Sequence, residues 1–276
     1  MKKFFSYFFP LVIICVFVVY HMLTPIGSDI EHHLSHLKKR AEEGNANSQA
    51  SVGDYYFMNR KYKEALEYYR KAAEQRQAHA EFQIGSMYAQ GLAISQDWKT
   101  AYEWWQKAAN DGHPDAQINM GLAYREDIYV SRDMSESFRW FREAANKWFN
   151  YEAQFYVADA YKKGLGVSED ISQALEWYLK VAERGDLKTR IKAQVNIGLI
   201  YFEGEGVEKN ETVAADWFTK AASNGDLGSA CMLGLMYRDG RGVEQSNTEA
   251  IKWWRKAAQK GDTWAMERLK EMGENW

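Results

Sequence analysis

Three histidines near the start of the chain, His32, His33 and His36, are the residues whose type and spacing come closest to doing chemistry. His32 and His36 are four residues apart, so on a helix they would share one face, as paired zinc ligands do. A metal site needs further ligands, and neither a cysteine nor a clear array of carboxylates lies beside them. We therefore interpret the histidines as part of a solvated linker or capping helix, and we expect no metal or cofactor site.

The two cysteines, Cys15 and Cys231, lie in very different contexts, so a disulfide framework is excluded. Cys231 falls in an apolar column of the repeats described below, which predicts a small packing residue rather than a nucleophile with a histidine beside it. The G-x-G-V segments of the chain lack the lysine and the preceding strand of a phosphate-binding loop. No catalytic constellation emerges, and we predict that the chain is not an enzyme.

The amino-acid composition of the chain limits the kinds of molecule that it can bind. The 276 residues carry 35 basic and 38 acidic side chains, for a formal net charge of −3. A nucleic-acid-binding surface needs clustered positive charge, so we exclude that class of partner. Only three prolines occur, which favours a helical protein.

An apolar segment runs from Phe4 to Leu23 and follows Lys2 and Lys3. Its length is about the 20 residues that a helix needs to cross a bilayer, and the lysines favour a cytoplasmic N-terminus. We expect residues 1–27 to be an uncleaved signal anchor, with residues 4–23 in the membrane and the rest of the chain outside the cytoplasm. The alternative is a cleaved signal peptide, which would leave the mature chain periplasmic or secreted.

The rest of the chain repeats itself at intervals of roughly 32 to 40 residues, which is typical of stacked supersecondary units. Each unit has a small residue followed three positions later by tyrosine. These anchor pairs are Gly53/Tyr56, Gly85/Tyr88, Gly121/Tyr124, Ala158/Tyr161, Gly198/Tyr201 and Gly234/Tyr237.

Each anchor belongs to a segment with apolar residues at helical spacing, which we interpret as the first helix of a pair. A glycine-rich turn such as Gly204-Glu205-Gly206-Val207 ends it. The second helix then carries an aromatic pair and a small pair, such as Trp217-Phe218 and Ala221-Ala222. We expect the aromatic pairs to insert between small residues of adjoining helices, because their register with the alanines is fixed.

The pattern G-x-x-Y, G-x-G-V, A-x-x-W-[YFW]-x-K-A-A-x-x-G resembles the Sel-one-like repeat, a relative of the tetratricopeptide repeat. The resemblance implies an all-α fold: a right-handed α-α superhelical solenoid of about six helix-turn-helix repeats over residues 45–262. Residues 28–44 would form a linker and capping helix, and residues 263–276 a C-terminal capping helix. The third repeat departs from the pattern in its turn, Asp127 to Val130, and the fourth by Ala158 and an insertion, LKTR, before Ala193.

In such arrays the first helices line a groove that commonly holds a partner. Columns of this face that vary in chemistry mix arginine, lysine and aromatic residues, as interfaces do. The candidate partner-binding residues are Asp54, Phe57, Arg125, Tyr156, Asp159, Lys162, Phe202 and Arg238. The alternative is an ordinary solvated helix face.

The repeat array, the apolar anchor and the lack of a catalytic constellation predict a non-catalytic protein-binding scaffold tethered to the inner membrane and facing the periplasm. The resemblance, which is mostly to bacterial proteins, implies a second interpretation: a periplasmic immunity protein that neutralises a toxin delivered by a secretion system, such as a phospholipase effector. Two further alternatives are a secreted host-interaction factor and an envelope hydrolase.

Overall fold

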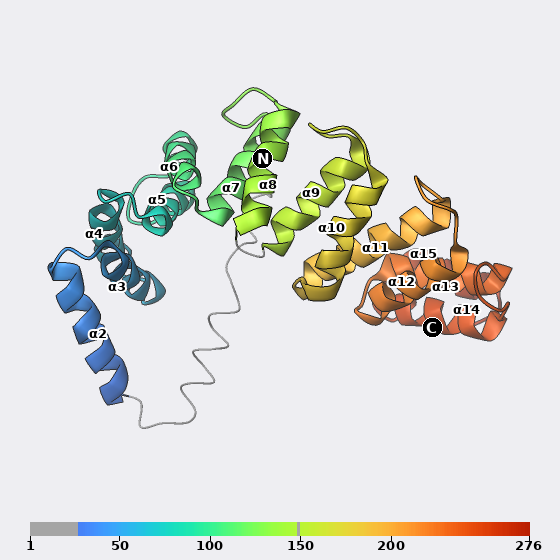
Figure 1. Cartoon of the computed structure of the whole chain (residues 1–276). Helices are drawn as coiled ribbons and strands as arrows, with labels where there is room; N and C mark the ends of the chain where they lie inside the picture. Colours follow the sequence, from blue (N-terminus) through green and yellow to red (C-terminus); the bar gives the residue numbers. More distant parts are fainter. Residues whose placement is uncertain (1–26, 148–149) are drawn as a thin grey trace. The chain divides into compact units, whose positions relative to one another are not determined.

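The computed structural model describes residues 27–147 and 150–276, and these residues form fourteen helices, α2 to α15, and no strand (Figure 1). This confirms the all-α class. The predicted membrane segment, residues 4–23, lies outside the described residues. Among the helices that are described, none is both long enough and apolar enough to span a bilayer.

The helices belong to two compact units, the first ending at Trp104 and the second running from Trp105 to Trp276. Unit 1 contains α2 (Gly27–Glu42), α3 (Ala46–Met58), α4 (Tyr62–Ala73), α5 (Ala78–Gln90) and the first part of α6 (Trp98–Asn110). Unit 2 contains the rest of α6, α7 (Pro114–Glu126), α8 (Met134–Lys147), α9 (Tyr151–Lys163), α10 (Ile171–Arg184), α11 (Leu187–Glu203), α12 (Glu211–Ser223), α13 (Leu227–Asp239), α14 (Asn247–Ala258) and α15 (Thr263–Glu271).

Helices α3, α5, α7, α9, α11 and α13 carry the anchor residues, and each is followed by the second helix of its pair. In unit 2, from α7 to α15, every helix packs on the next one along the chain. First helices also meet across pairs, since α9 contacts α11. Side chains of successive first helices can therefore share one surface.

The anchor glycines let the second ring of each aromatic pair approach the first helix. A Cβ added to Gly121 would lie 2.6 Å from Phe141 Cε1, and one added to Gly198 would lie 2.7 Å from Phe218 Cε1. These second rings are buried, and Phe218 is only 1% exposed. The first ring is usually half-buried instead, as at Trp217. The second rings therefore insert between the helices as expected, whereas the first rings insert only partly, except for Trp140, which is 5% exposed.

The two glycines of each glycine-rich turn have different structural roles. The first glycine ends the first helix in the left-handed conformation, as Gly204 does with φ +74°. The second glycine, such as Gly242, lies against the first residues of the preceding second helix, where an added Cβ would lie 2.7 Å from Thr212 N. In the third repeat, Asp127 and Tyr129 adopt this conformation without glycine, with φ of 59° and 61°.

The insertion before Ala193 lengthens a helix rather than breaking the array. Helix α11 begins at Leu187 and runs for 17 residues, with Asp186 as its N-cap. The second helices α10 and α12 begin after Asp170 and Asn210, whose side chains accept hydrogen bonds from the first turn. Ser246 caps α14 in the same way, with its side chain accepting from Glu249 N.

Candidate protein-binding face

Predicted contact residues in unit 2 come from the first helices of four successive pairs. They are Arg125 on α7, Tyr156, Asp159 and Lys162 on α9, Phe202 on α11, and Arg238 on α13. All are half-buried. A contact surface requires side chains that are at least partly exposed. The neighbours of each side chain then decide whether it retains free hydrogen-bonding groups.

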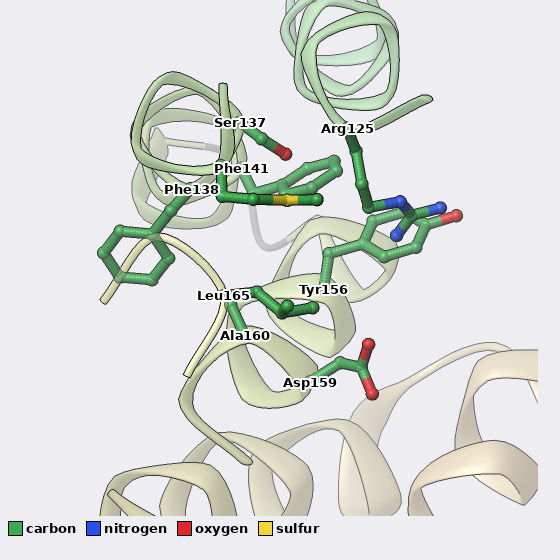
Figure 2. Close-up of a pocket in the computed structure, with 9 residues that line it drawn as sticks. Arg125, Ser137, Phe138, Phe141, Tyr156, Asp159, Ala160 and Leu165 are labelled. Atoms are coloured by element: carbon green, nitrogen blue, oxygen red, sulfur yellow. The ribbon is translucent and has the colours of Figure 1, made fainter. Parts of the chain in front are cut away.

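Arg125 lies on a platform of two aromatic rings (Figure 2). The rings of Phe141 and Tyr156 are stacked, with centroids 4.6 Å apart. The Arg125 guanidinium carbon is 5.1 Å from the Tyr156 ring and 5.9 Å from the Phe141 ring, within cation–π range. Its Nε donates to Glu126 at 2.8 Å. The two terminal nitrogens make no hydrogen bond to any described residue, so they are available to a partner.

Tyr156 is fixed in place under this guanidinium. Its hydroxyl donates to Glu152 Oε1 at 3.3 Å. Burial, together with the Glu152 carboxylate, raises the pKa of Tyr156 to about 12. Burial also raises the pKa of Glu152 above its ordinary value, against the opposing effect of the Tyr156 hydrogen bond. The platform is therefore a neutral ring held by a partly desolvated carboxyl group.

A small hollow opens beside the platform, between α7, α8 and α9. It is lined by Arg125, Met134, Ser137, Phe138, Phe141, Tyr156, Asp159, Ala160 and Leu165 (Figure 2). Its free volume is about 10 Å³, roughly what one water molecule needs. A hollow of this size is too small for a small-molecule site, which encloses hundreds of cubic ångströms.

Asp159 and Lys162 are engaged with charged neighbours. Asp159 pairs with Lys163 at 2.7 Å, and Lys162 pairs with Glu205, in the turn that follows α11, at 3.3 Å. The Lys162 side chain is only 13% exposed. It therefore joins one repeat to the next and presents little surface to a partner.

Phe202 and Arg238 lie further along the array. The Phe202 ring is covered by Arg241, whose guanidinium carbon is 4.3 Å from its centroid. Two nitrogens of Arg241 bind Glu211 Oε1, so this arginine is engaged. Arg238 binds its neighbour Asp239 through Nε at 2.6 Å and a second nitrogen at 3.0 Å.

Unit 1 holds the other two predicted residues, and one of them offers little surface. Phe57 is 8% exposed and packs against Tyr62 with ring centroids 5.3 Å apart, so it is a core residue. Asp54 is half-buried. Its Oδ1 accepts from the Tyr69 hydroxyl at 2.7 Å and lies 2.8 Å from His79 Nε2. Asp54 is therefore part of a local polar cluster.

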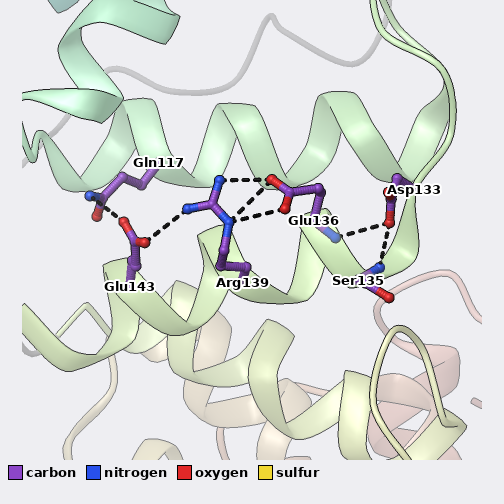
Figure 3. A network of polar contacts seen from close by, with 6 residues as sticks. All are labelled: Gln117, Asp133, Ser135, Glu136, Arg139 and Glu143. Carbon is purple, nitrogen blue, oxygen red and sulfur yellow. Dashed lines mark hydrogen bonds and ion pairs between the residues drawn. The ribbon is translucent and has the colours of Figure 1, made fainter.

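Arg139 on α8 shows how a saturated arginine differs from Arg125 (Figure 3). Its Nε and one terminal nitrogen bind Glu136, the latter at 2.7 Å, and its other terminal nitrogen binds Glu143 at 2.9 Å. Glu143 in turn accepts from Gln117 of α7 at 3.4 Å. This network ties two helices together and engages all three nitrogens of the guanidinium, whereas Arg125 uses only one.

Phe155 and Lys192 adjoin the same candidate face, although the sequence analysis did not name them. Phe155 is half-buried, with Tyr156 at a centroid distance of 6.2 Å. Lys192 of α11 is exposed, and its Nζ is 5.6 Å from the Phe155 ring. The signal was present, because Phe155 precedes Asp159 by four residues and so shares its helix face.

Of the residues considered for chemistry, His33 and His36 lie on α2 and Cys231 lies on α13. His33 and His36 are exposed on α2, and no group of potential metal ligands forms among the described residues. Cys231 is half-buried, and its Sγ donates to Asp262 Oδ1 at 3.6 Å. Burial and the Asp262 carboxylate raise the pKa of Cys231 to about 12, so its thiol is protonated at neutral pH.

The Sel1 repeat model matches residues 47–76, 78–113, 114–147, 152–186, 191–226 and 228–262. The chain belongs to the Sel1 repeat family. Sel1 repeat proteins are in general scaffolds for protein interactions, which agrees with a contact face built from first helices. A search of curated proteins finds no match.

Solved structures of Sel1 repeat proteins resemble this chain closely. A protective antigen of uropathogenic Escherichia coli with an SLR fold is 37% identical over 86% of this chain, with a TM-score of 0.76, and this chain spans 50% of its length. A Sel1 repeat protein from Oxalobacter formigenes is 29% identical over 81% of this chain and 90% of its own, with a TM-score of 0.72. A more distant structure, an immunity protein from Pseudomonas aeruginosa, is 16% identical over 75% of this chain and 81% of its own, with a TM-score of 0.44.

Proposed function

We propose that this Sel1 repeat protein is a non-catalytic scaffold that binds another protein along the first-helix face of unit 2. The observation that carries the proposal is the shared surface of Arg125, Tyr156 and Asp159, which come from two successive repeats and line one hollow. Tyrosine and arginine at a half-buried position are the residue types that dominate binding energy in interfaces.

Position-specific photo-crosslinking in cells that naturally make the chain tests the proposal. A photoreactive amino acid replaces Asn119, a half-buried residue of α7 six positions before Arg125. The matched control replaces Arg142, an exposed residue of the second helix α8. We expect one defined protein to be trapped from position 119 and not from position 142. Equal trapping at both positions, or none at 119, rejects the proposed face.

The cellular location is part of the same proposal. Lys2, Lys3 and the apolar run of residues 4–23 support a tether in the inner membrane with the repeats in the periplasm. Protease added to spheroplasts should digest the repeats while the membrane fraction retains the N-terminal segment. Recovery of a shortened chain from the culture medium would instead favour the secreted form.

The immunity interpretation is a narrower form of this function, and it rests on the family resemblance. It predicts that the partner is a toxin that arrives in the same compartment. A strain lacking the chain should be killed by toxin-delivering siblings, and complementation should restore survival. Survival of the deletion strain would leave the general scaffold as the preferred function.

A further inference from the structure

A strip of four side chains crosses α7, α9 and α11 in unit 2, and we define it as the cationic strip: Arg125, Tyr156, Phe155 and Lys192. Each cation lies beside one ring of the α9 pair, Arg125 beside Tyr156 and Lys192 beside Phe155. The two rings touch edge to face. The strip is therefore continuous, with a positive group at either end and apolar surface between them.

Both cations of the strip have unused hydrogen-bonding capacity. Arg125 uses only Nε, on Glu126, and Lys192 forms no ion pair with a described residue. Several other arginines of unit 2 are engaged through terminal nitrogens, as Arg139, Arg241 and Arg255 are with glutamates. The Arg125 side chain is only 24% exposed, so its remaining N–H groups are partly removed from water and favour a strong acceptor.

The carboxylates near the strip are already committed. Glu152 accepts from the Tyr156 hydroxyl, and Asp159 pairs with Lys163. Glu126, the partner of Arg125, is exposed, with 44% of its side chain accessible, and exposed pairs of this kind hold weakly. A carboxylate brought by another molecule would meet the free edge of the guanidinium, where two parallel N–H···O bonds can form.

We propose that the cationic strip binds an acidic segment of the partner protein, with one aspartate or glutamate on Arg125 and apolar side chains over the rings. The proposal rests on the function given above and specifies the chemistry of the partner. A planar guanidinium held beside two rings and fixed at Nε by Glu126 is preorganised, so its geometry selects a carboxylate over a neutral amide. Lys192 supplies a second positive point for an acidic residue further along the segment.

Selection from a random peptide library on the purified full chain tests the acid preference without knowledge of the partner. Peptides retained by the wild-type chain are expected to be enriched in aspartate and glutamate, and this enrichment is expected to disappear on Arg125→Gln. The best peptide is then synthesised with an amidated C-terminus, so that only side-chain carboxylates are measured. Its Glu-to-Gln and Asp-to-Asn counterpart should bind at least tenfold more weakly.

The variants separate a specific contact from general charge attraction. Arg125→Gln and Lys192→Gln should each weaken binding of the acidic peptide, by about tenfold for Arg125, because a charge-assisted bidentate pair is lost. Arg125→Lys keeps the charge and should restore only part of the affinity. Arg142→Gln, which removes an exposed charge from α8, should change nothing. Circular dichroism spectra of the variants verify that each is folded.

Three outcomes overturn the inference: selected peptides that are neutral or basic, binding that Arg142→Gln weakens as much as Arg125→Gln, and a selection that yields no peptide dependent on Arg125. The proposed function fails differently, because it predicts trapping of a protein from position 119 whatever the charge of its surface. Trapping at 119 without acid preference would refute the acidic segment and leave the scaffold function standing.

Discussion

Replacing Gly234 by alanine should destabilise unit 2, although alanine is the better helix former by about 1 kcal/mol. Gly234 lies inside α13, directly beneath the indole of Trp254. A Cβ at this position would lie 2.5 Å from Trp254 Cε2 and closer still to Nε1. Trp254 is fully buried, and its Nε1 donates to the Cys231 carbonyl at 3.2 Å. The indole cannot withdraw without breaking that bond.

The cost follows from these contacts. Leaving the buried indole N–H without its acceptor costs about 1–3 kcal/mol, and inserting a methyl group into a packed core costs about another 1–3 kcal/mol. After the gain in helix propensity, the free energy of unfolding should fall by about 3 kcal/mol. Gly228→Ala is the matched control, because it lies in the same helix, is exposed, and its nearest atom, Asp226 Oδ2, is 3.5 Å away. It should gain up to about 1 kcal/mol.

Urea unfolding of the two alanine variants, followed by circular dichroism, checks the prediction. The variants should differ in their free energy of unfolding by about 4 kcal/mol. Adding Trp254→Phe to Gly234→Ala should recover part of the loss, because a smaller ring leaves room for the methyl group, and the double-mutant cycle measures that coupling. Two alanine variants of equal stability would refute the argument that the repeated glycine exists to admit the ring.

Other substitutions probe the polar groups of the array. Tyr69→Phe removes a hydroxyl that donates to Asp54 at 2.7 Å, so the free energy of unfolding in urea should fall by about 1–3 kcal/mol. Tyr178→Phe removes a buried hydroxyl that has no hydrogen-bond partner among the described residues, so its loss should be under about 0.5 kcal/mol. Equal losses in the two variants would contradict this difference. Burial raises the pKa of Glu152, so the folded state favours its protonated form and loses stability as the pH rises above about 4.3 through the folded pKa. Glu152→Gln should therefore gain thermal stability over the wild-type chain as the pH rises from 4 to 7, and a difference independent of pH would contradict it. The Cys231 thiol, with its pKa raised to about 12, should react with iodoacetamide far more slowly in the native chain than in urea, and equal rates would show that it is accessible as thiolate.

The repeat period made the fold predictable, because each column of the pattern has one physical role. The small anchor residues, the glycine-rich turns and the second aromatic rings fix how neighbouring helices pack. Where the third repeat lacks glycine, Asp127 and Tyr129 still adopt the left-handed conformation. A residue other than glycine at these turn positions therefore strains the backbone locally, but the helix pair still forms.

The site was less predictable, because contacts that cross between repeats decide which side chains remain available. Lys162 is engaged by Glu205, which comes from the turn after the next first helix. Phe57 is buried because the first repeat has a shorter turn, which brings Tyr62 onto its ring. Column position alone gives a helix face. It does not give the ion pairs and ring contacts that occupy that face.

One further regularity links the anchor column to the polar chemistry of the face. The residue after the anchor is aspartate in the repeats whose second ring is tyrosine, Asp54 with Tyr69 and Asp159 with Tyr178, and it is not acidic in the others. In the first case the hydroxyl binds the carboxylate, while in the second Asp159 binds Lys163 instead. The same pair of residue types thus forms a hydroxyl–carboxylate hydrogen bond in the first repeat, while in the fourth repeat the carboxylate pairs with a lysine of its own helix. The residues that pack the helices can therefore stay the same from repeat to repeat while the polar contacts on the first-helix face change. Neighbouring repeats of one chain can present different chemistry for this reason.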